Sequence, residues 1–159
     1  MLKSALLLAL LVLPMTAEAL SPRPSLSPRP GWQVMPTDKP YAALLADLKT
    51  AVRAAKMGIV TEAGPTGAAA SRGITIPGNR VVGVFRNDFA VRALAASEAA
   101  MIEAPIRFYV TEGPGAGATL SWKTPSHVFA PYADGGADLQ AVAQELDAIF
   151  AAIGAAAAR

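Results

Sequence analysis

The clearest periodic pattern in the chain predicts an amphipathic helix over residues 41–55. Apolar side chains recur there at the three- and four-residue spacing of one helix face. They are Tyr41, Leu44, Leu45, Leu48, Val52 and Ala55. Thr37 or Asp38 can cap the helix, and Pro40 is favourable in its first turn. Gly58 predicts where the helix ends.

Two further helices are predicted nearer the C-terminus. One covers about residues 89–100 and has Asn87-Asp88 as N-caps directly after a strand. The other begins at Asp138 and ends at Gly154, which leaves residues 155–159 as a frayed tail. Its apolar positions are Leu139, Val142, Leu146, Ile149, Phe150 and Ile153.

Five strands are predicted from short apolar or alternating runs bounded by glycine and proline. They cover residues 32–35 (ended by Pro36), 58–63, 80–85, 106–111 and 118–123. The last two flank the glycine-rich residues 112–117 and predict a hairpin. The small residues 64–73 can hold one helical turn.

The order of these elements is strand, helix, strand, strand, helix, strand, strand, helix. Since helices and strands do not alternate strictly, a doubly wound nucleotide-binding fold is disfavoured. We predict a two-layer α+β domain with helices on one face of a mostly antiparallel sheet. Its other face is left open, and a second copy of the chain can cover it, so we expect a homodimer.

The first nineteen residues are interpreted as a signal peptide. Lys3 precedes an apolar run from Ala5 to Leu13, and Ala17-Glu18-Ala19 has the small-x-small pattern of a cleavage site. A transmembrane anchor is the alternative, but the run is far shorter than the ~20 residues that span a bilayer. A lipoprotein is excluded because the chain has no cysteine. We expect a periplasmic or secreted protein with no stable membrane anchor after cleavage.

Residues 20–31 are predicted to be a disordered, proline-rich linker. Ser-Pro-Arg-Pro occurs twice in this segment, and alternating prolines forbid a helix and remove sheet donors. A proline-rich recognition motif is the functional alternative, although an exported protein seldom meets cytosolic readers of such motifs. The remaining residues 32–154 are long enough for one domain with a single core.

Composition excludes several classes of chemistry. The chain has 159 residues, 53% hydrophobic and 16% charged, no cysteine, one histidine and a net charge of +2. Without cysteine there are no disulfides, thiolate zinc sites or iron–sulfur clusters bound by this chain. One histidine excludes a multi-histidine metal site within one chain, so no metal or cofactor is predicted. The lysines and arginines are scattered, which argues against nucleic-acid binding.

Two segments look like catalytic or phosphate-binding motifs. The glycine-rich Glu112–Ala118 lacks the lysine and following helix of a phosphate loop and is read as a hairpin turn. His127 would serve as a general base only beside a nucleophile such as Ser126, Tyr132 or an acidic partner. No motif surrounds it, so no catalytic residue is predicted, and an enzyme using His127 stays the third alternative.

Two groups of residues are candidates for ligand binding. A strand that runs directly into a capped helix presents free amides to an anion, and Arg86, Asn87 and Arg92 lie at such a junction. Asp88 would oppose the anion there. Arg107 and Tyr109 share one face of a predicted strand, and together with Trp122 across the hairpin they have the composition of an interface. The alternatives are a capped helix with surface arginines and a solvated sheet face.

The ordered combination of four motifs resembles the domain of unknown function 302 family over about residues 32–152. The motifs are Leu44–Lys49, Phe85-Arg86-Asn87, Pro105-Ile106-Arg107, and Leu120–Pro125 running on to Val128 and Tyr132. Many members have Gly-Asn-Pro where this chain has Arg86-Asn87-Asp88. The resemblance implies a TATA-binding-protein-like α+β arrangement and a homodimer, and it implies no activity.

The sequence therefore predicts an exported, non-enzymatic binding or interaction domain that acts as a homodimer. The alternative is a binding protein for a small anion or an acidic metabolite, with Arg86, Asn87, Arg92, Arg107 and Tyr109 as its candidate site.

Overall fold

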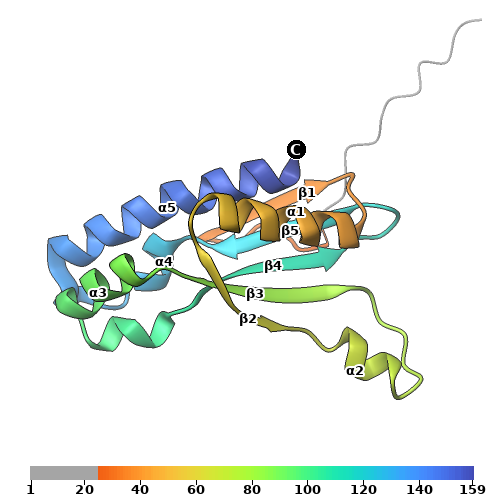
Figure 1. The fold of residues 1–159 in the computed structure, drawn as a ribbon, viewed down its shortest axis with the longest axis horizontal. Coiled ribbons are helices and arrows are strands. Elements are labelled where there is room, and N and C mark those ends of the chain that lie inside the picture. The colour runs from red at the N-terminus through yellow and green to blue at the C-terminus, as the bar shows by residue number, and fades with distance from the viewer. Residues whose placement is uncertain (1–24) are drawn as a thin grey trace, which may run out of the picture.

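The computed structural model describes residues 25–159 (Figure 1). The predicted signal peptide and the first part of the predicted linker lie outside this range. The elements follow in this order: β1 (Trp32–Thr37), α1 (Tyr41–Ala54), β2 (Gly58–Ala63), α2 (Thr66–Ala70), β3 (Asn79–Phe85), α3 (Asn87–Ala96), the 3₁₀ helix η1 (Ala99–Glu103), β4 (Ile106–Glu112), β5 (Ala118–Lys123), α4 (Pro125–Phe129), the 3₁₀ helix η2 (Ala133–Gly135) and α5 (Gly136–Ala158).

The strands form one five-stranded sheet in the order β1-β5-β4-β3-β2, and every neighbouring pair is antiparallel. The predicted β4–β5 hairpin and the α+β class are confirmed. The prediction that Pro36 ends the first strand is wrong, because β1 continues to Thr37. This strand is at the sheet edge, where a proline without an N–H costs no ladder hydrogen bond.

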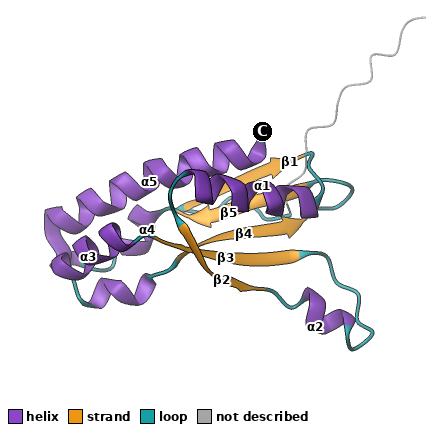
Figure 2. Ribbon diagram, in the orientation of Figure 1, coloured by secondary structure: helices purple, strands orange, loops and turns teal. Residues whose placement is uncertain are grey.

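Helices α1 and α5 lie across one face of the sheet and build the core against β4 and β5 (Figure 2). Phe108 of β4 stacks on Phe150 of α5 with ring centroids 4.6 Å apart, and Trp122 of β5 lies 5.4 Å from Phe108. The fully buried side chains include Leu44, Leu48, Val52, Val82, Val110, Leu120, Val142 and Ile153. These positions match the apolar faces that periodicity predicted.

Two helix boundaries differ from the prediction. Helix α1 has Pro40 at its N-cap with no side-chain cap, and it ends at Ala54 because Lys56 takes a left-handed backbone (φ 58°). Gly58 instead begins β2. Asn87 and Asp88 are the first residues of α3 rather than its caps.

The prediction that Gly154 ends the last helix is also wrong. Helix α5 continues to Ala158, and Ala157 is fully buried, so the tail is helical rather than frayed. Helical residues 133–158 are long and apolar enough to cross a membrane by length and composition alone. Their buried side chains form part of the core just described.

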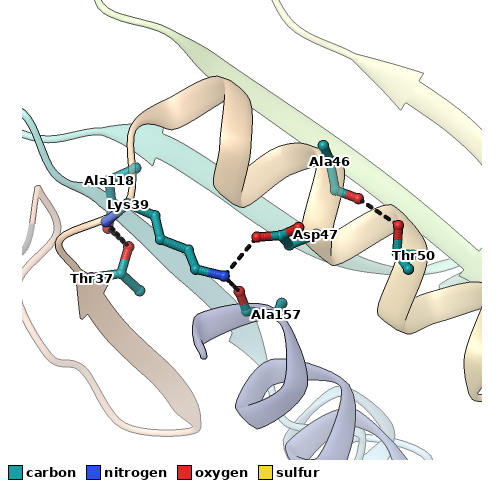
Figure 3. A network of polar contacts seen from close by, with 7 residues as sticks. All are labelled: Thr37, Lys39, Ala46, Asp47, Thr50, Ala118 and Ala157. Carbon is teal, nitrogen blue, oxygen red and sulfur yellow. Dashed lines mark hydrogen bonds and ion pairs between the residues drawn. The ribbon is translucent and has the colours of Figure 1, made fainter.

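Lys39, which lies between β1 and α1, makes hydrogen bonds to α1 and to the C-terminal end of α5 (Figure 3). Its Nζ donates hydrogen bonds to Asp47 Oδ2 of α1 at 2.6 Å and to the Ala157 carbonyl at 2.9 Å. A cation suits the last carbonyls of a helix because the helix dipole is negative there. Thr37 Oγ1 donates to the Ala118 carbonyl at 2.9 Å and fixes the end of β1 beside β5.

The face of the sheet opposite the helices is partly covered by residues 25–31, which we call the arm. Ser25 N donates to Thr119 Oγ1 at 3.1 Å, and the Ser25 hydroxyl contacts Thr111 Oγ1. Thr119 has no exposed surface and Thr111 is 8% exposed, although neither faces the helices. This part of the predicted linker therefore lies against the sheet.

Candidate functional site

Beside the arm, the helix-free face of the sheet holds a pocket of about 240 Å³. We call it the open-face pocket. Charged and aromatic side chains from four elements line it: Trp32 of β1, Glu103 of η1, Arg107 and Tyr109 of β4, and Lys123 of β5.

Strand alternation places these residues on the open face. In β4, Ile106, Phe108 and Val110 are buried toward the helices, so Arg107 and Tyr109 point the other way. Trp32 pairs with Lys123 across β1 and β5, and Tyr109 pairs with Ser121 across β4 and β5. The predicted placement of Arg107 and Tyr109 on one strand face is thereby confirmed.

Trp122 does not belong to that face, contrary to the prediction that grouped it with Arg107 and Tyr109. The hairpin register pairs it with Phe108, and its side chain is 3% exposed within the core. The aromatic side chain that joins Tyr109 on the open face is Trp32. The register of the hairpin decides this, because a shift of one residue moves a side chain to the opposite face.

Cations surround the ring of Trp32. Arg29 Cζ of the arm lies 5.1 Å from the ring centroid, and Lys123 Nζ lies 5.8 Å from it. Such positions are within the range of a cation–π attraction. Within residues 25–159, neither Arg107 nor Lys123 forms an ion pair. The pocket is therefore lined by two cationic side chains that are in no ion pair among the described residues.

Glu103 is the acidic member of the pocket, and it is held by Tyr132. The Tyr132 hydroxyl donates to Glu103 Oε1 at 2.7 Å, and this bond raises the pKa of Tyr132 above its ordinary value of 10.0. The carboxylate favours the protonated hydroxyl because only that form can donate. The bond leaves the second carboxylate oxygen free of this contact.

Sequence reasoning missed Trp32, Lys123 and Glu103 as pocket residues. Trp32 and Lys123 come from strands that lie far apart in the sequence, and only the β1–β5 register makes them neighbours. Glu103 and Tyr132 are 29 residues apart and belong to no shared local pattern. The only available signal was that Trp32 is the first residue of one predicted strand and Lys123 is the last residue of another.

The predicted anion site at the start of α3 is internally neutralised. Arg86 Nε pairs with Asp88 Oδ1 at 2.8 Å, and Arg92 makes two hydrogen bonds to the Glu145 carboxylate, at 2.9 and 2.7 Å. These arginines hold the pKa values of Asp88 and Glu145 below their ordinary values, and Glu145 raises the pKa of Arg92.

Both arginines also flank the ring of Phe89, at 4.3 Å for Arg86 and 5.5 Å for Arg92. Asn87 is exposed at the first turn of α3. Arg86 borders a separate apolar cavity of about 40 Å³, which Arg107 and Tyr109 do not line. The five predicted binding residues therefore fall into two places, and only Arg107 and Tyr109 share the open-face pocket.

His127 and Ser126 are not brought together. Ser126 Oγ donates to Asp147 Oδ2, and Ser126 N donates to Asp147 Oδ1 at 3.0 Å, which anchors the start of α4 to α5. The His127 ring is packed against the backbone of Gly31 on the arm. Tyr132, the other hydroxyl considered beside His127, is bonded to Glu103 instead. The described residues thus hold no assembled base and nucleophile around His127, and they contain no group of three potential metal ligands.

The fold and the pocket define a two-layer α+β domain with a hollow, lined by aromatic, apolar and charged side chains, on the helix-free face of its sheet. The model of the family described as "Domain of unknown function DUF302" matches residues 33–155, and the chain belongs to this family. A solved relative is described as the crystal structure of an uncharacterized conserved protein DUF302 from Bacillus stearothermophilus. It is similar with a TM-score of 0.71 and 13% identity, over 82% of this chain and 100% of that chain. No curated protein matches the chain.

Proposed function

We propose that the chain is an exported, non-enzymatic binding domain and that the open-face pocket takes a small acidic ligand. The observation that carries this proposal is that Arg107 lines the pocket together with Lys123, and that neither cation forms an ion pair among the described residues. An anion is the partner that these two cations lack.

The size of the pocket limits the ligand. A dry cavity of about 150 Å³ accommodates a benzene molecule. The open-face pocket, at about 240 Å³, therefore has room for a single-ring or short-chain acid. Its aromatic and cationic lining matches a ligand with an apolar body and one anionic group.

Calorimetric titration of residues 20–159 with benzoate, 3-phenylpropionate, phosphate and sulfate tests this proposal. We expect at least one carboxylate to bind, and we expect Arg107→Met to weaken its binding by about tenfold or more. Arg72→Met is the matched control, since Arg72 is exposed in the loop after α2. The proposal is rejected if none of the four anions binds, or if the two arginine variants bind equally well.

A homodimer through the open face is a second candidate, supported by the construction of the sheet edges. Proline lies within edge strand β1, and edge strand β2 has a register shift between Ile59 and Thr61. Both features oppose edge-to-edge pairing. Ala63 and Thr61 on the open face are exposed, as is Val60 at 53%.

Light scattering coupled to size exclusion tests the dimer. We expect twice the mass of residues 20–159 at micromolar concentration, and Ala63→Arg should reduce it to one copy. Lys56→Glu is a control at an exposed position between α1 and β2. A wild-type protein that elutes as a single copy contradicts the dimer and leaves the ligand site untouched.

Export rests on the amino-terminal pattern alone. Expression of the whole chain in a bacterium, followed by fractionation and amino-terminal sequencing, should place the protein in the periplasm with Leu20 first. Retention of Met1 on cytoplasmic protein would contradict this part of the proposal.

A further inference from the structure

The open-face pocket is lined by a guanidinium group and a carboxylate that do not form an ion pair with each other. Arg107 and Glu103 both line it, yet no nitrogen of Arg107 lies within ion-pair distance of the Glu103 carboxylate. Elsewhere in the described chain, Lys39, Lys49, Arg86 and Arg92 are each paired with an acid. An anionic ligand bound to Arg107 would lie close to the Glu103 carboxylate, which carries the same sign of charge.

The position of Glu103 is fixed from outside the pocket. Tyr132 follows α4 and donates its hydroxyl to Glu103 Oε1 at 2.7 Å. One carboxylate oxygen is thus held by the protein, and the other remains to accept from a ligand. An ammonium group is the complement of a carboxylate, because it is a cation with three donors.

The remaining walls are apolar. Val81 of β3 and Val128 of α4 line the pocket together with the ring of Trp32. Such walls favour a ligand with an apolar surface, because contact with them removes that surface from water. Lys123 already lies near the ring of Trp32, so Arg107 is the cation of this pocket that has neither an ion-pair partner nor an aromatic ring beside it among the described residues.

From this arrangement we propose that the natural ligand is a zwitterionic amino acid with a large apolar side chain or body. Arg107 binds its carboxylate, Glu103 binds its ammonium group, and Trp32 and Val128 contact its apolar part. Tyr132 is a positioning residue that acts through Glu103. This inference rests on the proposed function, and it adds a requirement for positive charge on the ligand.

Four probes, each built on one benzene ring, test the contributions of the ligand's carboxylate and ammonium groups separately. L-phenylalanine carries both charges on one carbon, and 4-(aminomethyl)benzoate carries them on opposite sides of the ring. 3-Phenylpropionate lacks the ammonium group, and phenethylamine lacks the carboxylate. We expect one zwitterion to bind residues 20–159 about tenfold or more tightly than either single-charge probe in calorimetric titrations.

Two variants assign the preference to Glu103. Glu103→Gln keeps the shape and an acceptor for Tyr132 but loses the charge, so the zwitterion should keep less than about a threefold advantage over 3-phenylpropionate. Tyr132→Phe should reduce the same advantage partly. Glu98→Gln, at an exposed acid just before η1, should leave it unchanged. Melting temperatures show whether each variant is folded.

The outcomes separate the two proposals. If 3-phenylpropionate binds the wild-type protein as tightly as both zwitterions, the zwitterion inference is wrong and the acid-binding function stands. If a zwitterion is preferred but Glu103→Gln retains the full preference, the assignment to Glu103 is wrong. If neither these probes nor the four anions bind, both proposals fail together.

Discussion

Trp122 lies against Gly154 so closely that a Cβ on Gly154 would clash with the indole, with Cζ3 at 2.8 Å. This contact explains why a glycine occurs within α5. Gly154→Ala would gain about 1 kcal/mol of helix propensity, but overpacking a full core costs about 1–3 kcal/mol. We therefore expect a net loss in the free energy of unfolding of up to about 2 kcal/mol, measured by urea denaturation.

Gly67→Ala is the matched control for this substitution. Gly67 is also helical, in α2, and a Cβ there would meet no atom within 4 Å. That variant should be neutral or more stable by about 0.5–1 kcal/mol. Equal effects of the two substitutions would show that the contact with Trp122 does not limit position 154.

Replacing Lys39 should loosen the end of α5. Lys39→Met removes the hydrogen bonds to the Ala157 carbonyl and to Asp47. We expect the free energy of unfolding to fall by about 1 kcal/mol. Amide exchange should accelerate at residues 155–158 more than in α1. Arg72→Met, at an exposed loop position, should change neither quantity; unchanged exchange in Lys39→Met would contradict the role of Lys39.

The pair formed by Arg92 and Glu145 should make the stability of the folded chain depend on pH in the acidic range. Arg92 lowers the pKa of Glu145 below its ordinary 4.5, so the folded chain binds the proton less readily than the unfolded chain does. The stabilisation is therefore present above the unfolded value and is lost as the pH falls through the lowered folded value.

Glu145→Gln tests this dependence. Since the pair is solvent-exposed, we expect its melting temperature to lie about 1–3 °C below wild type at neutral pH. The difference should disappear in acid below the lowered pKa of Glu145. Glu98→Gln serves as the control, because Glu98 forms no ion pair within the described residues. A difference that stays constant down to the acid limit would contradict the pairing.

Gly31 is expected to be intolerant of any side chain, for two separable reasons. It has a left-handed backbone (φ 72°), and a Cβ would clash with the ring of His127. Gly31→Ala should cost about 1–2 kcal/mol from the backbone alone, with a further loss from the clash. Adding His127→Ala should restore only the second part. Urea denaturation of the single and double variants measures both, and full restoration would show that backbone strain is absent.

Only part of the candidate site could be predicted from the sequence. Alternation along 106–111 correctly put Arg107 and Tyr109 on one strand face, because the pleat is a local property of the chain. The partners of these residues came from long-range pairing. Trp32 meets Lys123 through the β1–β5 register, and Glu103 of η1 meets Tyr132, which is 29 residues away in the sequence. Arg86 and Arg92 both flank Phe89, but Glu145, which pairs with Arg92, lies 53 residues away in the sequence.

By itself, the sequence determined the order of helices and strands, the apolar helix faces and the α+β class. Periodicity and turn residues act within a few positions, so they can be read without knowing which segments meet. Tertiary structure decided that Gly154 lies inside a helix, that Pro36 lies inside an edge strand and that the arm covers Thr119. It also decided which charges remain unpaired in the open-face pocket. Packing and pairing between distant segments outweigh local preferences at those positions. Close contact with Trp122 requires a glycine at position 154, and a place at the sheet edge allows a proline at position 36.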